Sequence, residues 1–115
     1  MREELGCSQV RNELPVGPRR IDLVGLRKRE IITVELKLRD WRAALRQAWR
    51  NTICSHWSCV ALPYDVANHV ATQEFMRYGI GVWAVQGSRI IVAKEAEPSP
   101  CLRPFLEPVM QQMRL

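Results

Sequence analysis

Two acidic residues and a lysine are spaced so that two neighbouring strands would bring them together. Glu35 and Lys37 lie two positions apart in a run of alternating apolar residues, so on a strand their side chains emerge on one face. Asp22 lies upstream, on the polar side of a second alternating run. A hairpin formed by the two runs would place Asp22 beside Glu35. The sequence therefore predicts a cluster of two carboxylates and one ammonium group.

Such a cluster suits the metal-dependent hydrolysis of a phosphodiester. Carboxylate oxygens are hard ligands that Mg²⁺ prefers, and Mg²⁺ usually takes only one or two of them from the protein. Asp22 and Glu35 are therefore candidate ligands for Mg²⁺ or Mn²⁺, and Lys37 is a candidate for orienting or deprotonating the attacking water. The alternative is a hairpin with one charged, solvated face, which would carry the same residue types without any function.

Positive charge is concentrated in the same part of the chain. Residues 18–50 carry ten basic and four acidic side chains, a net charge of +6, whereas the whole chain carries +5. A local positive field of this kind is typical of proteins that bind a polyanion. The candidates for contacting nucleic-acid phosphates are Arg20, Arg39, Arg42 and Arg46. A solvated basic face without a partner is the alternative.

The elements that would position these residues follow from hydrophobic periodicity. Period-two alternation predicts an antiparallel hairpin over residues 21–26 and 32–39, and apolar spacing of three and four predicts a helix over 41–52, with Asp40 as its N-cap. The other expected elements are a short helix at 2–6, strands at 9–14, 57–62, 80–85 and 89–93, a helix at 66–78 ended by Gly79, and a last helix through Met113. The fold class predicted is α/β, with one domain over residues 1–115 and a mixed sheet flanked by helices.

The tryptophans and cysteines are predicted to be structural. Trp41 and Trp49 lie on the apolar face of the expected helix and are assigned to the core, as are Trp57 and Trp83 on strands. The four cysteines form no CxxC pair, so we expect reduced thiols. Cys54, His56 and Cys59 lie close together in the sequence, but their spacing does not match a zinc site, and no structural metal is assigned to them.

Length and composition limit the class of protein. The chain has 115 residues, of which 47% are hydrophobic and 25% charged, as in an ordinary globular domain. No apolar stretch is long enough to span a membrane, and the N-terminus lacks the apolar region of a signal peptide. We therefore expect a cytoplasmic protein.

The stretch RRIDLVGLRKREIITVELKLRDWRAALRQAWRN, residues 19–51, resembles the PD-(D/E)xK nuclease superfamily. Asp22, the Glu35-Leu36-Lys37 triplet and Gln47 on the following helix occur in the order that this superfamily uses. The resemblance is strongest to small single-domain members with restriction-endonuclease-like or Holliday-junction-resolvase-like folds. It implies that Asp22 and Glu35 bind Mg²⁺ or Mn²⁺, that Lys37 serves the attacking water, and that Gln47 lies near the active site.

The resemblance also bears on other positions. Many members carry a glutamate on an N-terminal helix, which Glu3 or Glu4 would match, with Glu13 as a weaker alternative. Residue 21 is isoleucine where the motif name has proline, and Asn51 stands where one branch has an aromatic residue.

Together these observations predict a metal-dependent DNA endonuclease, a phosphodiesterase acting through Asp22, Glu35 and Lys37. The main alternative is a non-catalytic nucleic-acid-binding module, or an accessory subunit, with the same fold. A toxin-like or transfer-RNA-directed nuclease is a third interpretation. Cutting both strands of a duplex needs two active sites, which a homodimer would provide.

Overall fold

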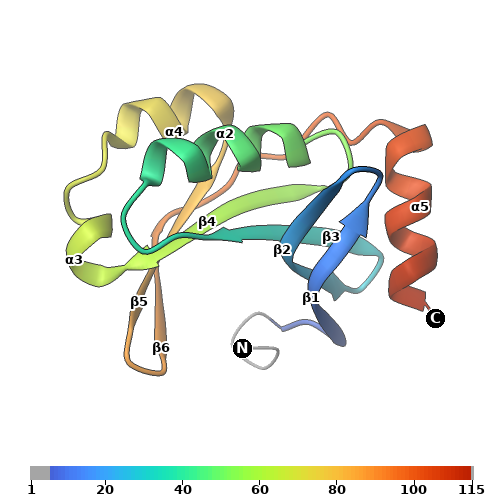
Figure 1. Ribbon diagram of the computed structural model, residues 1–115, viewed down its shortest axis with the longest axis horizontal. Coiled ribbons are helices and arrows are strands. Elements are labelled where there is room, and N and C mark those ends of the chain that lie inside the picture. Colours follow the sequence, from blue (N-terminus) through green and yellow to red (C-terminus); the bar gives the residue numbers. More distant parts are fainter. Residues whose placement is uncertain (1–5, 115) are drawn as a thin grey trace.

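A computed structural model describes residues 6–114 of the chain, so residues 2–5 of the expected helix at 2–6, with the candidates Glu3 and Glu4, lie outside the described residues. Six strands form one sheet in the order of the sequence, β1-β2-β3-β4-β5-β6 (Figure 1). The strands are β1 (Gln9–Val16), β2 (Arg19–Arg27), β3 (Glu30–Leu36), β4 (Trp57–Pro63), β5 (Gly81–Gln86) and β6 (Arg89–Lys94). The helices are α2 (Trp41–Asn51), α3 (Tyr64–Ala67), α4 (Thr72–Tyr78) and α5 (Arg103–Arg114).

The sheet is mixed, and its connections explain why. Short turns join β1 to β2, β2 to β3 and β5 to β6, and each of these pairs is antiparallel. Helix α2 separates β3 from β4, and α3 with α4 separates β4 from β5, so both of these pairs are parallel. Parallel neighbours need such crossovers because the chain must return to the same end of the sheet. The predicted α/β class and mixed sheet are confirmed.

Helices α2 and α4 lie over one face of the sheet (Figure 1). The core beneath them joins Ala44, Leu45 and Ala48 of α2 to Phe75 of α4 and to apolar side chains of β4 and β5. Asp40 caps α2 as predicted, because its Oδ1 accepts a hydrogen bond of 3.0 Å from the Ala43 backbone N–H. The apolar stripe of α2 therefore fixes the helix, and its basic stripe, along the sheet.

Two further clusters complete the core. On the opposite face, side chains of β2, β3, β4 and β5 pack against Val10, Ile90 and Ala96. At the end of the sheet beside β1, helix α5 inserts Val109, Met110 and Met113 between side chains of β1, β2 and β3 (Figure 1). The described chain has a radius of gyration of 13.0 Å, close to that of a single compact domain of this length.

Several sequence predictions about local structure are wrong. The helix expected at 66–78 is two helices, α3 and α4, because residues 68–71 are not helical. Asn68, His69 and Val70 are weak helix formers, which lets the chain turn between them. Gly79 ends α4 as predicted, in the left-handed conformation that glycine adopts without strain (φ 70°). The predicted strand 32–39 ends at Leu36, and Leu38 is 79% exposed.

Trp49 is also misassigned, since its side chain is 55% exposed rather than in the core. Trp83 is buried as predicted, and Trp41 packs at the border of the core under α2. Within residues 6–114, no helix is both long and apolar enough to cross a membrane.

Candidate active site

The structure brings Asp22 and Glu35 together at the point where the pairing of β2 with β3 stops. The paired register runs from Arg27 opposite Glu30 to Leu23 opposite Val34. One position further, the Leu36 backbone N–H donates to Asp22 Oδ2 (2.8 Å) and the Asp22 backbone N–H donates to Glu35 Oε2 (3.4 Å). The two carboxylates therefore accept hydrogen bonds from the backbone N–H groups that lie just past the end of the sheet ladder.

Glu35 is buried under helix α2 rather than solvated. Only 3% of its surface is exposed, and its Oε2 accepts a second hydrogen bond from Asn51 Nδ2 (2.9 Å). Asn51 is itself 1% exposed, and its Oδ1 accepts from Arg19 Nη1 (3.2 Å). Because the Asn51 side chain donates through its nitrogen and accepts through its oxygen, its amide is held in one orientation and in turn orients the Glu35 carboxylate.

The environment of Glu35 raises its pKa above the ordinary value. Burial is the largest cause, because it disfavours the charged carboxylate, and the neighbouring Asp22 charge acts in the same direction. The hydrogen bonds from Asn51 and the Asp22 backbone, together with the Lys37 charge, lower the pKa but do not cancel the effect of burial. A cation bound between the carboxylates would stabilise the ionised form.

Lys37 follows β3 directly and keeps the strand spacing. Its backbone N–H donates to the Ala61 carbonyl (3.3 Å), so the chain still runs along β4 after β3 ends. The two-residue spacing from Glu35 places both side chains on one side of the strand. Within residues 6–114, Lys37 makes no ion pair with either carboxylate, although its charge lowers the pKa of Glu35.

A buried set of hydroxyl groups fixes the end of α2 against β3. Thr33 Oγ1 donates to Ser55 Oγ (3.0 Å), and Ser55 Oγ donates to the Asn51 carbonyl (2.7 Å). Ser58 of β4 donates to the Ala48 carbonyl (2.6 Å). These hydroxyl groups are buried and each is hydrogen-bonded, so they favour one placement of the helix end and hence of the Asn51 amide.

Sequence reasoning missed Asn51 and Arg19 as parts of this site. Asn51 lies one helical turn after Gln47, so the helix presents both on the same side. That spacing from the glutamine was the signal available. Gln47 is half-buried, and among residues 6–114 its amide makes no hydrogen bond. Nothing places it in contact with Glu35.

Glu13 lies on β1, at the position opposite Asp22 of β2, between the paired residues Asn12–Leu23 and Leu14–Ile21. Its backbone has a positive φ of 53°, uncommon for a residue other than glycine. The side chain is exposed and does not join the carboxylates in a group of three.

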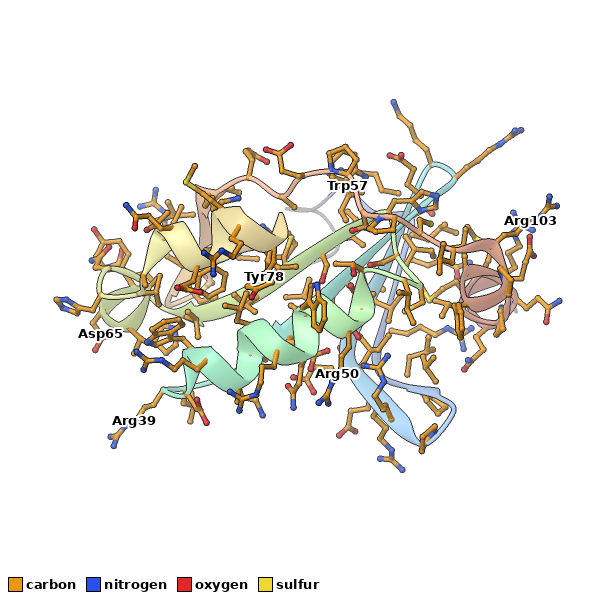
Figure 2. All side chains as sticks on the ribbon, turned by 90° about the horizontal axis from the view of Figure 1, so that it is seen from above. Arg39, Arg50, Trp57, Asp65, Tyr78 and Arg103 are labelled. Atoms are coloured by element: carbon orange, nitrogen blue, oxygen red, sulfur yellow. The ribbon has the colours of Figure 1, made fainter. Side chains whose placement is uncertain are left out.

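The four basic candidates are all exposed, with Arg20 on β2 and the other three at the start of α2 or along it. Figure 2 shows Arg39 and Arg50 near the two ends of α2, on the side away from Tyr78. The Arg42 guanidinium lies over the Trp41 ring, 4.4 Å from its centre. Their positive charge therefore faces solvent, available to a ligand.

The donor set at the carboxylates fits a magnesium-type ion that keeps most of its water. Among residues 6–114, no hydrogen bond reaches Asp22 Oδ1 or Glu35 Oε1, which leaves one oxygen of each carboxylate available. In the same part of the chain, no three histidine, cysteine or acidic side chains gather as a metal cage. Two carboxylates completed by water and substrate are what Mg²⁺ usually takes.

The cysteines and His56 serve the core. Cys54 and Cys59 pack in two different hydrophobic clusters, and His56 Nδ1 accepts a hydrogen bond of 2.9 Å from the Ile31 backbone N–H. Burial raises the pKa of Cys59 to about 12, so it stays a thiol at neutral pH.

Comparisons with known proteins identify the architecture only. No protein-family model matches the sequence, and no curated protein matches it significantly. Among solved structures, the chain is similar to a protein of unknown function from Silicibacter pomeroyi. The TM-score is 0.73 and the identity 14%, covering 98% of this chain and 75% of that chain. At this identity, the similarity establishes a shared fold.

Proposed function

We propose that this protein is a Mg²⁺- or Mn²⁺-dependent endonuclease that hydrolyses DNA phosphodiester bonds through Asp22, Glu35 and Lys37. The proposal includes the restriction-endonuclease-like form of the fold, with which the antiparallel β1-β2-β3 unit followed by α2 is compatible. A homodimer acting on both strands of a duplex, and a cytoplasmic location, belong to the same proposal.

The single observation that carries the proposal is a pair of adjacent carboxylates, Glu35 buried and Asp22 half-buried, that no ion pair neutralises among residues 6–114. Glu35 is 3% exposed, next to Asp22, and its pKa is raised by burial. Leaving an ionised carboxylate in such a place costs free energy. Buried titratable groups with perturbed pKa values occur preferentially at functional sites, and a divalent cation would relieve this cost.

Each residue has a defined task in the proposed reaction. Asp22 and Glu35 hold the ion, which when bound would stabilise the charge that develops on the phosphate. Asn51 and the Asp22 and Leu36 backbone N–H groups orient the carboxylates, leaving one oxygen of each available. Lys37 is placed on the same side as Glu35 to orient the attacking water or take its proton. The exposed arginines of α2 hold the flanking phosphates.

Cleavage of supercoiled plasmid tests the function directly. Wild-type protein is expected to nick the plasmid with Mg²⁺ or Mn²⁺ and to be inactive with chelator. Asp22→Asn and Lys37→Ala should each lower the rate by about 100-fold or more, because each removes a group that the reaction uses. Nicked and linear products would be separated on agarose gels over time.

Asp65→Asn is the matched control, since Asp65 is an exposed carboxylate on the short helix α3, labelled at the left of Figure 2. It should cleave like the wild type. Circular dichroism of each variant separates loss of chemistry from loss of fold. Metal-independent cleavage would refute the proposal, and DNA binding without cleavage of any substrate would favour the non-catalytic module instead.

A further inference from the structure

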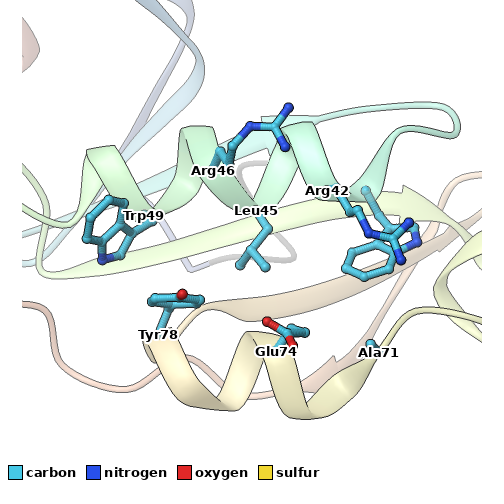
Figure 3. Close-up of a pocket in the computed structure, with 8 residues that line it drawn as sticks. Arg42, Leu45, Arg46, Trp49, Ala71, Glu74 and Tyr78 are labelled. Carbon is cyan, nitrogen blue, oxygen red and sulfur yellow. The ribbon is translucent and has the colours of Figure 1, made fainter.

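Trp49 and Tyr78 form an exposed aromatic pair between two helices. Trp49 of α2 is 55% exposed and Tyr78 of α4 is 39% exposed, with ring centres 5.7 Å apart and planes tilted by 56°. Figure 3 shows the two rings side by side, Trp49 extending from α2 and Tyr78 from α4. A contiguous exposed aromatic surface with charged side chains around it marks a binding site more often than scattered apolar residues do.

The pair closes one end of a groove of about 410 Å³ between α2 and α4. Leu45 forms part of its floor, and Arg42 and Arg46 line it from α2. Glu74 is its acidic residue and comes from α4, whereas both basic lining residues come from α2. Figure 3 shows Arg42 at the end of the groove opposite the aromatic pair, and the Arg46 guanidinium directed away from α4. Flat aromatic faces beside guanidinium groups match a ligand that is both aromatic and anionic.

At its aromatic end the groove shares Trp49 with a second hollow. This hollow, of about 430 Å³, is also lined by Arg19 and Arg50. Arg19 donates to Asn51, and Asn51 donates to Glu35. A ligand lying over Trp49 would therefore have arginines on both sides, one of them two hydrogen bonds from the proposed catalytic carboxylate.

We propose that the Trp49–Tyr78 pair is a stacking platform for an unpaired base, so that the protein recognises DNA with single-stranded segments. The inference rests on the proposed nuclease function and adds its substrate class. The base would stack on Trp49 or Tyr78 while the flanking phosphates pair with the arginines of α2 and with Arg19. Bases within a duplex cannot present their faces in this way, because their neighbours already cover them.

Binding in the presence of chelator tests the platform without any cleavage. Fluorescence anisotropy would compare labelled oligothymidylate with a hairpin duplex of similar length at fixed salt. Wild type should bind the single strand more tightly than the duplex. Trp49→Leu should weaken single-strand binding by about tenfold or more, and Tyr78→Leu should weaken it several-fold, as loss of a stacked base requires. Phe105→Leu, at a 48% exposed position on α5, is the matched control and should bind normally.

Intrinsic fluorescence provides an independent readout. Oligothymidylate should quench tryptophan emission in the wild type, and Trp49→Phe should remove most of the quenching although the other three tryptophans remain. Unchanged affinity in Trp49→Leu and Tyr78→Leu would overturn the platform. So would a wild-type dimer, seen by light scattering, that Trp49→Leu converts to monomer, because the groove would then be a protein interface. Because no cleavage occurs in chelator, these outcomes are independent of whether the plasmid is nicked.

Discussion

Glu35 is a carboxylate that the fold buries at a cost. Two N–H donors reach its Oε2, but burial and the Asp22 charge still raise its pKa above the ordinary value of 4.5. A group whose pKa is raised in the folded state stabilises the protein below its unfolded pKa, and this stabilisation is lost as the pH rises through the folded pKa. Ionised Glu35 therefore opposes folding at neutral pH when no cation is bound.

We expect Glu35→Gln to remove this pH dependence. The amide is neutral, and its oxygen still accepts from Asn51 and from the Asp22 backbone. Melting temperatures would be measured in chelator between about pH 4 and about pH 8. That of the wild type should fall as the pH rises through the pKa of Glu35 in the folded protein, which lies above the value of a free carboxyl group. The variant should show a flatter profile and melt higher at the alkaline end.

Thermal melts followed by circular dichroism would measure both profiles. Glu97→Gln, at an exposed position, is the control and should keep the wild-type slope. A steeper fall in Glu35→Gln than in the wild type would contradict the raised pKa. Addition of Mg²⁺ should raise the melting temperature of the wild type more than that of Glu35→Gln, because the ion needs both carboxylates.

Sequence reasoning predicted the meeting of Asp22 and Glu35 because it depends on a local hairpin. Alternation fixes which residues share a face, and a short turn fixes the pairing. The burial of Glu35 depends instead on where α2 comes to lie, and that placement involves Ser55 and, at the start of β4, Ser58. No pattern within the hairpin contains this information, so Asn51 and Arg19 were missed.

At the level of the elements, helix α2 supplies Asn51 and basic side chains of the proposed site, whereas the catalytic candidates lie on or directly after strands. It begins at its cap, Asp40, and ends with Asn51 against Glu35. We expect Asp40→Ala to cost about 1 kcal/mol of the free energy of unfolding, because the Ala43 N–H loses its acceptor. Urea unfolding would measure the change. Asp40→Asn keeps an acceptor oxygen and should lose much less; an equal loss in the two variants would show that charge, rather than capping, matters.

Sequence patterns predicted local features of the elements but not how the elements pack against one another. The cap of α2, the glycine that ends α4 and the two strands at 80–85 and 89–93 were predicted because each depends on a few adjacent residues. Trp49 was assigned to the core from helical periodicity alone. The apolar stripe of α2 is wider than the surface beneath it, since α4 and the sheet already cover Leu45 and Ala48. Periodicity predicts which way a side chain points from its helix, but not how far the surface that the helix packs against extends.

At the scale of the whole molecule, exposed basic side chains lie both along α2 and at the other end of the sheet on α5. Arg42 and Arg46 of α2 line the groove, whereas α5 packs at the other end of the sheet (Figure 1). We expect the double variant Arg42→Ala with Arg46→Ala to weaken DNA binding and to lower the slope of log affinity against log salt by about two units, one for each phosphate contact.

Binding titrations at several salt concentrations would give the slope. The double variant Arg103→Ala with Arg114→Ala removes the same charge from α5 and should leave the slope nearly unchanged. Equal slopes for both double variants would mean that net charge alone governs binding. Arg42 also packs over Trp41, so a melt of each variant would accompany the titrations.

The origin of the carboxylate site in one short stretch of chain has a consequence for folding. Asp22, Glu35, Asn51 and Arg19 all belong to residues 19–51, whereas α5 reaches β1 only by closing most of the chain, as in the bond from Gln112 to the Pro15 carbonyl. Contacts between residues close in sequence form faster than distant ones, because less loop entropy is lost. We therefore expect the carboxylate pair to assemble early, before the C-terminal helix docks.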